Sequence, residues 1–115
     1  MRKSNFSSYI GKDMSILVIL SLLYHDGVHS GYSLVKKIKK LTNGQLKFRV
    51  GTVYSQIEKL LEEGFLIQNI QYITDKKVKA EYSLTSEGIK KREKMLTEWN
   101  ETITLFEKLV KQNNE

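Results

Sequence analysis

The sequence predicts a mainly α-helical protein with one small β-hairpin and a long C-terminal helix. Up to residue 64, apolar residues recur every three or four positions, which is typical of helices packed on one face. Residues 65–84 are rich in Ile, Tyr and Phe and then alternate between apolar and polar, as half-buried strands do. After residue 85 the apolar spacing becomes seven. A chain of 115 residues has room for one compact domain. We therefore expect a single head, residues 1–84, followed by a C-terminal helix, residues 85–115.

The first part of the head is expected to contain a very apolar helix. Residues 1–12 predict one or two amphipathic turns, and Asp13 is expected to cap the helix that follows. That helix is apolar almost all round over residues 16–23 and ends at the turn Asp26-Gly27. A helix without a polar face must be covered on more than one side, so we expect a second subunit to supply part of the cover.

Two further helices are predicted over residues 31–41 and 51–63. Ser30 is a suitable N-cap for the first of them, and Thr42-Asn43-Gly44 closes it because Asn and Gly accept left-handed backbone. Gly64 ends the second. The apolar stripes are Leu34, Val35, Ile38 and Leu41 in one helix, and Val53, Ile57, Leu60 and Leu61 in the other. Four side chains near the N-terminal half of helix 51–63 are expected to face outward: Thr52, Ser55, Gln56 and Lys59.

The hairpin and the last helix complete the order. Residues 65–74 and 78–84 predict two strands around a charged connector over residues 75–77, and Thr85 is expected to cap a helix over residues 86–112. The heptad positions of this helix are Ile89, Arg92, Leu96, Trp99, Ile103, Phe106 and Val110. A helix this long cannot bury such a stripe on a small head, so the sequence predicts a partner helix.

Composition excludes several classes of function. There is no cysteine, which excludes a disulfide framework, a thiolate metal site and a cysteine nucleophile. His25 and His29 lie four apart but across a predicted helix end, which is poor metal-ligand geometry, and no phosphate loop or nucleophile elbow occurs. We therefore expect no enzyme activity, no metal and no cofactor. The longest apolar stretch, residues 16–23, is far shorter than the ~20 residues that span a bilayer, and no signal peptide is evident, so we expect a cytoplasmic protein.

The excess of positive over negative charge is confined to the head. The formal net charge is +6, and residues 1–83 hold 13 basic and 7 acidic side chains, whereas residues 84–115 hold 6 of each. A basic head on a neutral helix is typical of a protein that binds a polyanion through one region and assembles through another.

The order of helix, helix, helix, hairpin and helix is that of a winged helix-turn-helix. In this arrangement the third helix enters the DNA major groove and the hairpin lies over the flanking backbone. Thr52, Ser55, Gln56 and Lys59 are therefore the candidates for contact with base edges. The candidates for contact with the phosphate backbone are Lys36, Lys37, Lys40, Lys47, Arg49, Lys76, Lys77 and Lys79.

Several motifs resemble those of the PadR family of bacterial transcriptional regulators, in its short form with one C-terminal helix. The matching segments are Gly31-Tyr32-Ser33-Leu34, Gly51-Thr52-Val53-Tyr54, residues 60–67 and Tyr82-Ser83-Leu84-Thr85 with Gly88. The resemblance covers residues 9–106 and adds Tyr32 and Tyr54 to the DNA-binding candidates.

The chain departs from the family pattern at the recognition helix and the wing. Val50 and Ser55 stand where the family usually has proline, and Lys79-Ala80-Glu81-Tyr82 replaces a more basic Arg-Lys-Tyr-Tyr. The added acid weakens the case for contact between wing and phosphate.

The resemblance implies a homodimer that represses transcription from a palindromic operator and responds to a small molecule. It places the dimer interface on the last helix and the N-terminal helix, at Ile16, Leu20, Leu96, Trp99, Ile103, Phe106 and Val110. It also implies that Trp99 stacks on a flat aromatic effector. The alternative interpretation is a winged helix that binds another protein and does not read DNA.

Overall fold

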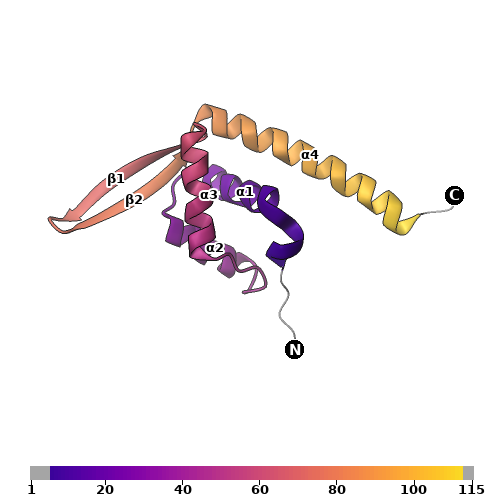
Figure 1. Ribbon diagram of the computed structural model, residues 1–115, viewed down its shortest axis with the longest axis horizontal. Coiled ribbons are helices and arrows are strands. Elements are labelled where there is room, and N and C mark those ends of the chain that lie inside the picture. Colours follow the sequence, from indigo (N-terminus) through magenta and orange to yellow (C-terminus); the bar gives the residue numbers. More distant parts are fainter. Residues whose placement is uncertain (1–5, 113–115) are drawn as a thin grey trace.

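The computed structural model describes residues 6–112, with side chains from residue 12 onward, and confirms the mainly α-helical fold with one hairpin. The elements follow one another as α1 (Phe6–Asp26), α2 (Gly31–Leu41), α3 (Val50–Glu62), β1 (Leu66–Thr74), β2 (Lys77–Leu84) and α4 (Ser86–Lys111). Figure 1 shows three helices gathered into a head, from which the hairpin extends on one side and α4 on the other. None of the described helices is long and apolar enough to cross a membrane.

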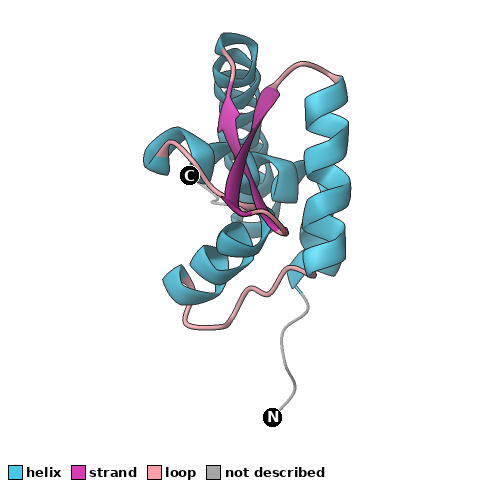
Figure 2. Ribbon diagram, turned by 90° about the vertical axis from the view of Figure 1, so that its left-hand side faces the viewer, coloured by secondary structure: helices cyan, strands magenta, loops and turns pink. Residues whose placement is uncertain are grey.

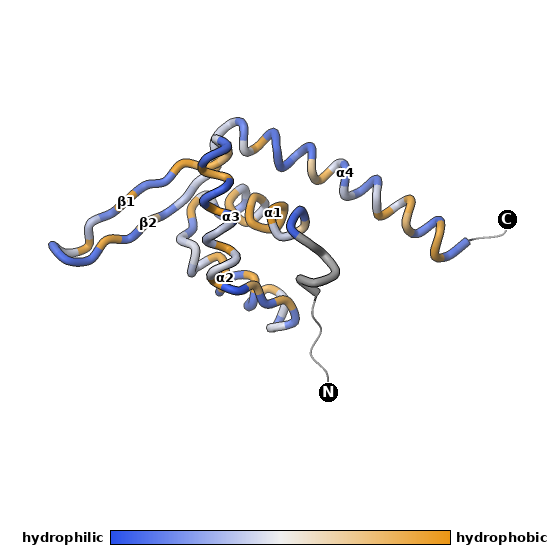
Figure 3. The backbone as a smooth tube through the Cα atoms, in the orientation of Figure 1, coloured by the Kyte–Doolittle hydropathy of each residue, from blue (hydrophilic) through white to orange (hydrophobic). Residues whose placement is uncertain are grey.

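Helix α1 is one continuous element and forms the centre of the head. The prediction that Asp13 caps a helix is wrong, because α1 begins at Phe6 and Asp13 lies on its exposed surface. Of the helical turns predicted over residues 1–12, residues 6–12 belong to α1 itself. Residues 1–5, and the side chains before residue 12, lie outside the part of the chain that the structure describes. Ile19, Leu20 and Leu23 are fully or almost fully buried, and Figure 3 shows the hydrophobic run of α1 to which they belong.

Helices α2 and α3 pack through the stripes that the sequence predicts, except that Leu41, predicted to belong to the stripe of α2, is 63% exposed because it lies in the last turn, beyond the contact with α3. Ser30 caps α2 with a reciprocal capping box, in which its hydroxyl accepts from the Ser33 amide at 3.0 Å. Leu34 of α2 and Ile57 of α3 are completely buried in the same cluster as α1. The connection between the two helices adds Phe48, which is 6% exposed.

The hairpin is an antiparallel pair with Leu66 opposite Leu84 and Tyr72 opposite Val78. Its connection is shorter than predicted, because Lys77 already belongs to β2. The base of the hairpin is anchored to the head, where the backbone of His29 exchanges hydrogen bonds with Tyr82 at 2.8 and 3.2 Å. Burial raises the pKa of the Tyr82 phenol at this anchor. Figure 2, which faces the hairpin, shows the two strands standing in front of the helices.

Helix α4 is attached to the described part of the head mainly through its first half. Thr85 caps it, accepting from the Gly88 amide at 3.0 Å, and Gly88 lies so close to the Phe65 carbonyl that a side chain there would collide with it. Arg92 donates to the Ser21 hydroxyl at 3.0 Å and lies over a tyrosine ring of α1, so this polar heptad residue binds its own head. Beyond Ile103 the described side chains of α4 are exposed.

Candidate nucleic-acid interface

A groove between α1 and α3 is lined by all four residues predicted to contact bases. It has a volume of about 520 Å³. The residues that line it are Lys12, Ile16, Arg49, Gly51, Thr52, Ser55, Gln56 and Lys59. The three cations, the two hydroxyls and the first turn of α3 make this surface cationic and rich in hydrogen-bonding groups. We call it the α3 groove.

Local sequence explains how α3 presents this face. Arg49 occupies its N-cap position without any side-chain hydrogen bond to the helix, so the first amides of α3 carry no side-chain cap. Thr52, Ser55 and Lys59 follow at helical spacing and are all exposed, while Val53, Ile57 and Leu60 face the core. The positive end of the helix dipole adds to the cations of the groove.

Lys12 is a groove residue that the sequence analysis missed. The expected helix start at Asp13 left Lys12 in a separate N-terminal segment, whereas the continuous α1 places it one turn before Ile16 on the side facing α3. Reading a single helix from Phe6 onward would have revealed it, because Lys12 and Ile16 are four residues apart.

Gln56 does not face outward, and that prediction is wrong. Its side chain is 9% exposed, and its Nε2 donates to the Ser15 hydroxyl of α1 at 2.6 Å. It lies on the floor of the α3 groove, because position 56 of the helix falls between the exposed and the buried stripe. Of the four residues predicted to contact bases, Gln56 is therefore the one whose side chain is buried within the head.

Tyr54 has a packing role in addition to its exposed surface. Its ring is 38% exposed and covers the start of α2 so closely that a Cβ at Gly31 would lie 2.5 Å from the ring carbon Cζ. This contact explains why glycine opens α2 and tyrosine follows Gly51-Thr52-Val53 in the motif.

The basic side chains of α2 differ in how they are held. Tyr32 is 60% exposed, and the Lys36 ammonium lies 5.7 Å from the centre of its ring. Lys37 forms an ion pair with Asp26 at 3.3 Å, so its charge is partly neutralised within the head. Lys40 is exposed in the last turn. Of the three lysines of α2 predicted to contact phosphate, Lys37 is therefore the one whose charge a carboxylate of the described head offsets.

Asp26 sits at the centre of a polar cluster where α1 ends. His29 Nε2 donates to the Asp26 carboxylate at 2.7 Å, and this hydrogen bond, together with Lys37, holds the pKa of Asp26 below its usual value. His29 also contacts the Ser33 hydroxyl at 2.7 Å. Among the residues that the structure describes, no group of three His, Cys, Asp or Glu side chains could hold a metal ion.

The wing carries less free charge than its lysines suggest. Lys76 lies exposed in the turn and Lys77 exposed at the start of β2, but Lys79 forms an ion pair with Glu81 at 3.3 Å. The outer wing also exposes Ile70, which is 53% accessible, on the face that carries Tyr72 and Val78.

The predicted interface residues of the C-terminal helix remain largely uncovered in the single chain. Leu96 and Ile103 are partly exposed, and Trp99 is 39%, Phe106 63% and Val110 64% exposed. On α1, Ile16 is partly buried beside the α3 groove, whereas Leu20 is 0% exposed. Leu20 therefore packs in the core of its own chain and has no surface to offer a second subunit.

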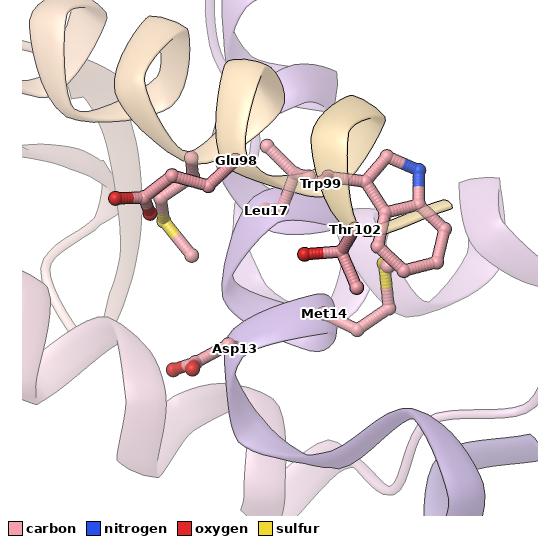
Figure 4. A pocket seen from close by; sticks show the side chains of 7 residues that line it. Asp13, Met14, Leu17, Glu98, Trp99 and Thr102 are labelled. Carbon is pink, nitrogen blue, oxygen red and sulfur yellow. The ribbon is translucent and has the colours of Figure 1, made fainter. Parts of the chain in front are cut away.

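A smaller pocket of about 240 Å³ lies between α1 and α4, at Trp99. Figure 4 shows the Trp99 ring and the Met14 side chain on one side of it and the carboxylates of Asp13 and Glu98 on the other. The remaining lining residues are Leu17, Met95 and Thr102. The pocket thus combines an aromatic wall with negative charge.

Comparisons with known proteins agree with this geometry. A family model described as the transcriptional regulator PadR-like family matches residues 19–94. A transcriptional regulator from Clostridium thermocellum is 27% identical with a TM-score of 0.80, over 93% of this chain and 99% of that one. Bacillus subtilis PadR, solved in complex with operator DNA, is 27% identical with a TM-score of 0.64, over 70% of this chain and 45% of that one.

A third structure, a PadR family transcription regulator from Clostridium difficile, is 18% identical with a TM-score of 0.70, over 83% of this chain and 96% of that one, and shows likeness of fold alone. A search among curated proteins finds no match. The family model spans more than half of the chain and includes α2, α3 and the whole wing. This chain therefore belongs to the PadR-like family of transcriptional regulators.

Proposed function

We propose that this protein is a repressor that binds an inverted-repeat operator as a homodimer and reads it through the α3 groove. In this proposal residues 1–84 form the DNA-binding head and residues 85–115 the dimerisation helix. The observation that carries it is the convergence of Lys12, Arg49 and Lys59 on one groove with the hydroxyls of Thr52 and Ser55. Bacillus subtilis PadR, a relative of the same fold, was solved with operator DNA, which supports duplex DNA as the partner.

The residues proposed to contact DNA divide into those that contact base edges and those that contact phosphate. Lys59, Thr52 and Ser55 are assigned to base edges, because they lie along one exposed face of α3. The phosphate contacts are assigned to Lys12, Tyr32, Lys36, Lys40, Arg49, Tyr54, Lys76 and Lys77. Lys37 and Lys79 contribute less, because each already has a carboxylate partner.

The dimer is proposed to form through α4 and the adjoining part of α1. Large apolar side chains left uncovered on α4 support a protein partner, and the heptad register supports a second copy of the same helix. Two α3 helices in such a dimer would lie about 34 Å apart, so the operator half-sites would be one helical turn apart, centre to centre.

The pocket at Trp99 is proposed as the effector site. An exposed indole beside Met14 favours a flat aromatic molecule, and the carboxylates of Asp13 and Glu98 favour a positive charge on it. Trp99 is the sole tryptophan, so quenching of its fluorescence by planar aromatic cations such as ethidium measures binding. An unchanged emission across a panel of such cations would contradict the effector site and leave the DNA proposal untouched.

The experiment that tests DNA reading is selection from a pool of duplexes with random sequence, followed by mobility-shift titration of the selected duplexes over a salt series. We expect an inverted repeat to be selected and its affinity to fall by orders of magnitude from low to physiological salt. Selection of no common sequence would contradict the proposal.

The apolar face of the outer wing favours a second candidate, a winged helix that binds a protein. Ile70, Tyr72 and Val78 are each more than half exposed on that face. This alternative predicts no retarded DNA band at any salt concentration, so the same titration separates the two functions.

A further inference from the structure

Two buried polar side chains, Ser15 of α1 and Gln56 of α3, face each other under the α3 groove. The Ser15 hydroxyl donates to the Lys12 carbonyl at 2.9 Å, so its oxygen is left to accept from Gln56 Nε2 at 2.6 Å. Within the described part of the chain, Gln56 Oε1 is the one buried side-chain oxygen or nitrogen that has no hydrogen-bond partner. Gln56 is therefore only half satisfied in this position.

A half-satisfied amide is a poor choice for a purely structural contact. Burying an acceptor without a donor costs free energy, and an apolar side chain of similar size would fill the same space without that cost. The buried position of Gln56 is thus weakly favoured, and any place that satisfies both ends of the amide competes with it.

The α3 groove provides such a place. Gln56 lines it, and Thr52, Ser55 and Lys59 occupy the neighbouring positions of the same stripe on α3. Rotation about the side-chain torsions of Gln56 moves its amide from the floor of the groove toward the open side without moving α3. The open groove has room for this movement, at about 520 Å³.

The chemistry of the groove indicates what the amide would meet. Lys12, Arg49 and Lys59 attract an anion, whereas Gln56 Oε1 requires a donor and Nε2 a new acceptor. The edge of adenine in a DNA major groove meets both demands, because its N6 donates, its N7 accepts, and the flanking phosphates carry the negative charge. A fully deprotonated inorganic anion such as sulfate offers no donor for Oε1.

We propose that Gln56 is a specificity-determining residue that exchanges Ser15 for an adenine edge when the duplex is bound. Ser15 holds the amide inside the head of the free protein, and DNA draws it into the groove. The inference rests on the proposed function, because it requires that the α3 groove reads a duplex.

The test uses the full chain and the pool of random duplexes, with four proteins: the unaltered chain, Gln56→Leu, Ser15→Ala and the double variant. We expect the unaltered protein to select an A·T pair at one position in each half-site. Replacing that adenine by 7-deazaadenine, which lacks N7, should weaken its binding by on the order of 10-fold. Gln56→Leu should bind both duplexes equally while keeping its thermal unfolding temperature.

Ser15→Ala removes the partner of the inward position and should strengthen binding to the adenine duplex several-fold, with no change toward unselected duplex. In the Gln56→Leu background the same substitution should have no effect. A uniform loss on both duplexes would show that Ser15 and Gln56 only support the packing of α1 on α3, and would overturn the inference.

A further variant tests the inference by a change of base preference rather than by a loss of binding. Gln56→Glu keeps the length of the side chain but can only accept, so the selected pair should change from adenine to cytosine, whose N4 donates. Unchanged base preference in this variant would also overturn the inference. A different result contradicts the proposed function: the unaltered protein selects no common sequence from the pool. In that case the inference about Gln56 is contradicted as well.

Discussion

The α3 groove and the outer half of α4 are both exposed, but their side chains differ in what exposure costs. The groove presents cations and hydroxyls that water solvates well. The outer half of α4 presents Leu105, Phe106, Leu109 and Val110, each 60 to 70% exposed, and exposed apolar surface costs about 25 cal/mol per Å². The uncovered groove therefore costs little free energy, whereas we expect the end of α4 to be covered by a second subunit in the proposed dimer.

The same contrast separates the core of the head from α4. Ile19 and Leu20 of α1 and Ile57 of α3 are completely buried without any partner chain. The apolar side chains of α4 beyond Ile103 have no such cover from the part of the chain that the structure describes. The head thus has a core of its own, whereas we expect the stability of the outer half of α4 to depend on association.

The largest expected effect is on the stability of the head. Leu20→Ala should lower the free energy of unfolding by roughly 2–5 kcal/mol, because it leaves a cavity in the core, and should leave the oligomeric state unchanged. Urea unfolding and sedimentation measure the two quantities. Leu41→Ala is the control, since Leu41 is 63% exposed, and its effect should be about 0.5 kcal/mol or less. A smaller loss for Leu20 than for Leu41 would contradict the separation of core from interface.

The next largest effect concerns the proposed dimer interface on α4. Phe106→Glu should dissociate the dimer and lower operator affinity by about 100-fold or more, because each head then binds alone. Thr104→Glu is the matched control, since it adds the same charge on an exposed helix position outside the heptad stripe. Sedimentation velocity should show a monomer for the first variant and a dimer for the second. A dimer in both would contradict the heptad interface.

A third effect lies within the basic surface. Lys59→Ala should cost roughly 1–3 kcal/mol on the selected operator and relax base preference, whereas Lys36→Ala should weaken binding to all duplexes alike and reduce the salt slope by about 1. Mobility-shift titrations on selected and unselected duplexes at several salt concentrations distinguish them. Uniform weakening by both variants would mean that α3 is oriented differently on the duplex.

The smallest effect is the response of the α1–α2 corner to acid. The pKa of Asp26 is lowered in the folded protein, so its contribution to stability is present above the unfolded pKa near 3.8 and is lost as pH falls through the lower folded value. Thermal unfolding measured as the pH is lowered from neutrality through this range should therefore bring the unaltered protein closer to Asp26→Asn. A constant difference between them would contradict the role of the carboxylate.

The sequence determined most of the fold, since spacing and caps are local properties. Ser30 and Thr85 cap the helices as predicted, and the bounds of α2 agree with the prediction because its stripe ends at a left-handed turn. Arg49, predicted to contact phosphate, lines the same groove as Thr52, Ser55 and Lys59, predicted to contact bases, because these four residues share one helix and its N-cap.

Tertiary structure alone decided which side chains the neighbouring elements cover. Leu20 is apolar and at a suitable spacing for an interface, but only the packing of α1 within the common core shows that its own chain surrounds it. Gln56 is polar and lies next to exposed residues, but Ser15 is 41 positions away and turns it inward. Periodicity reports the direction of a side chain around its own helix axis, whereas burial depends on what lies opposite, and that is set by contacts between residues distant in sequence.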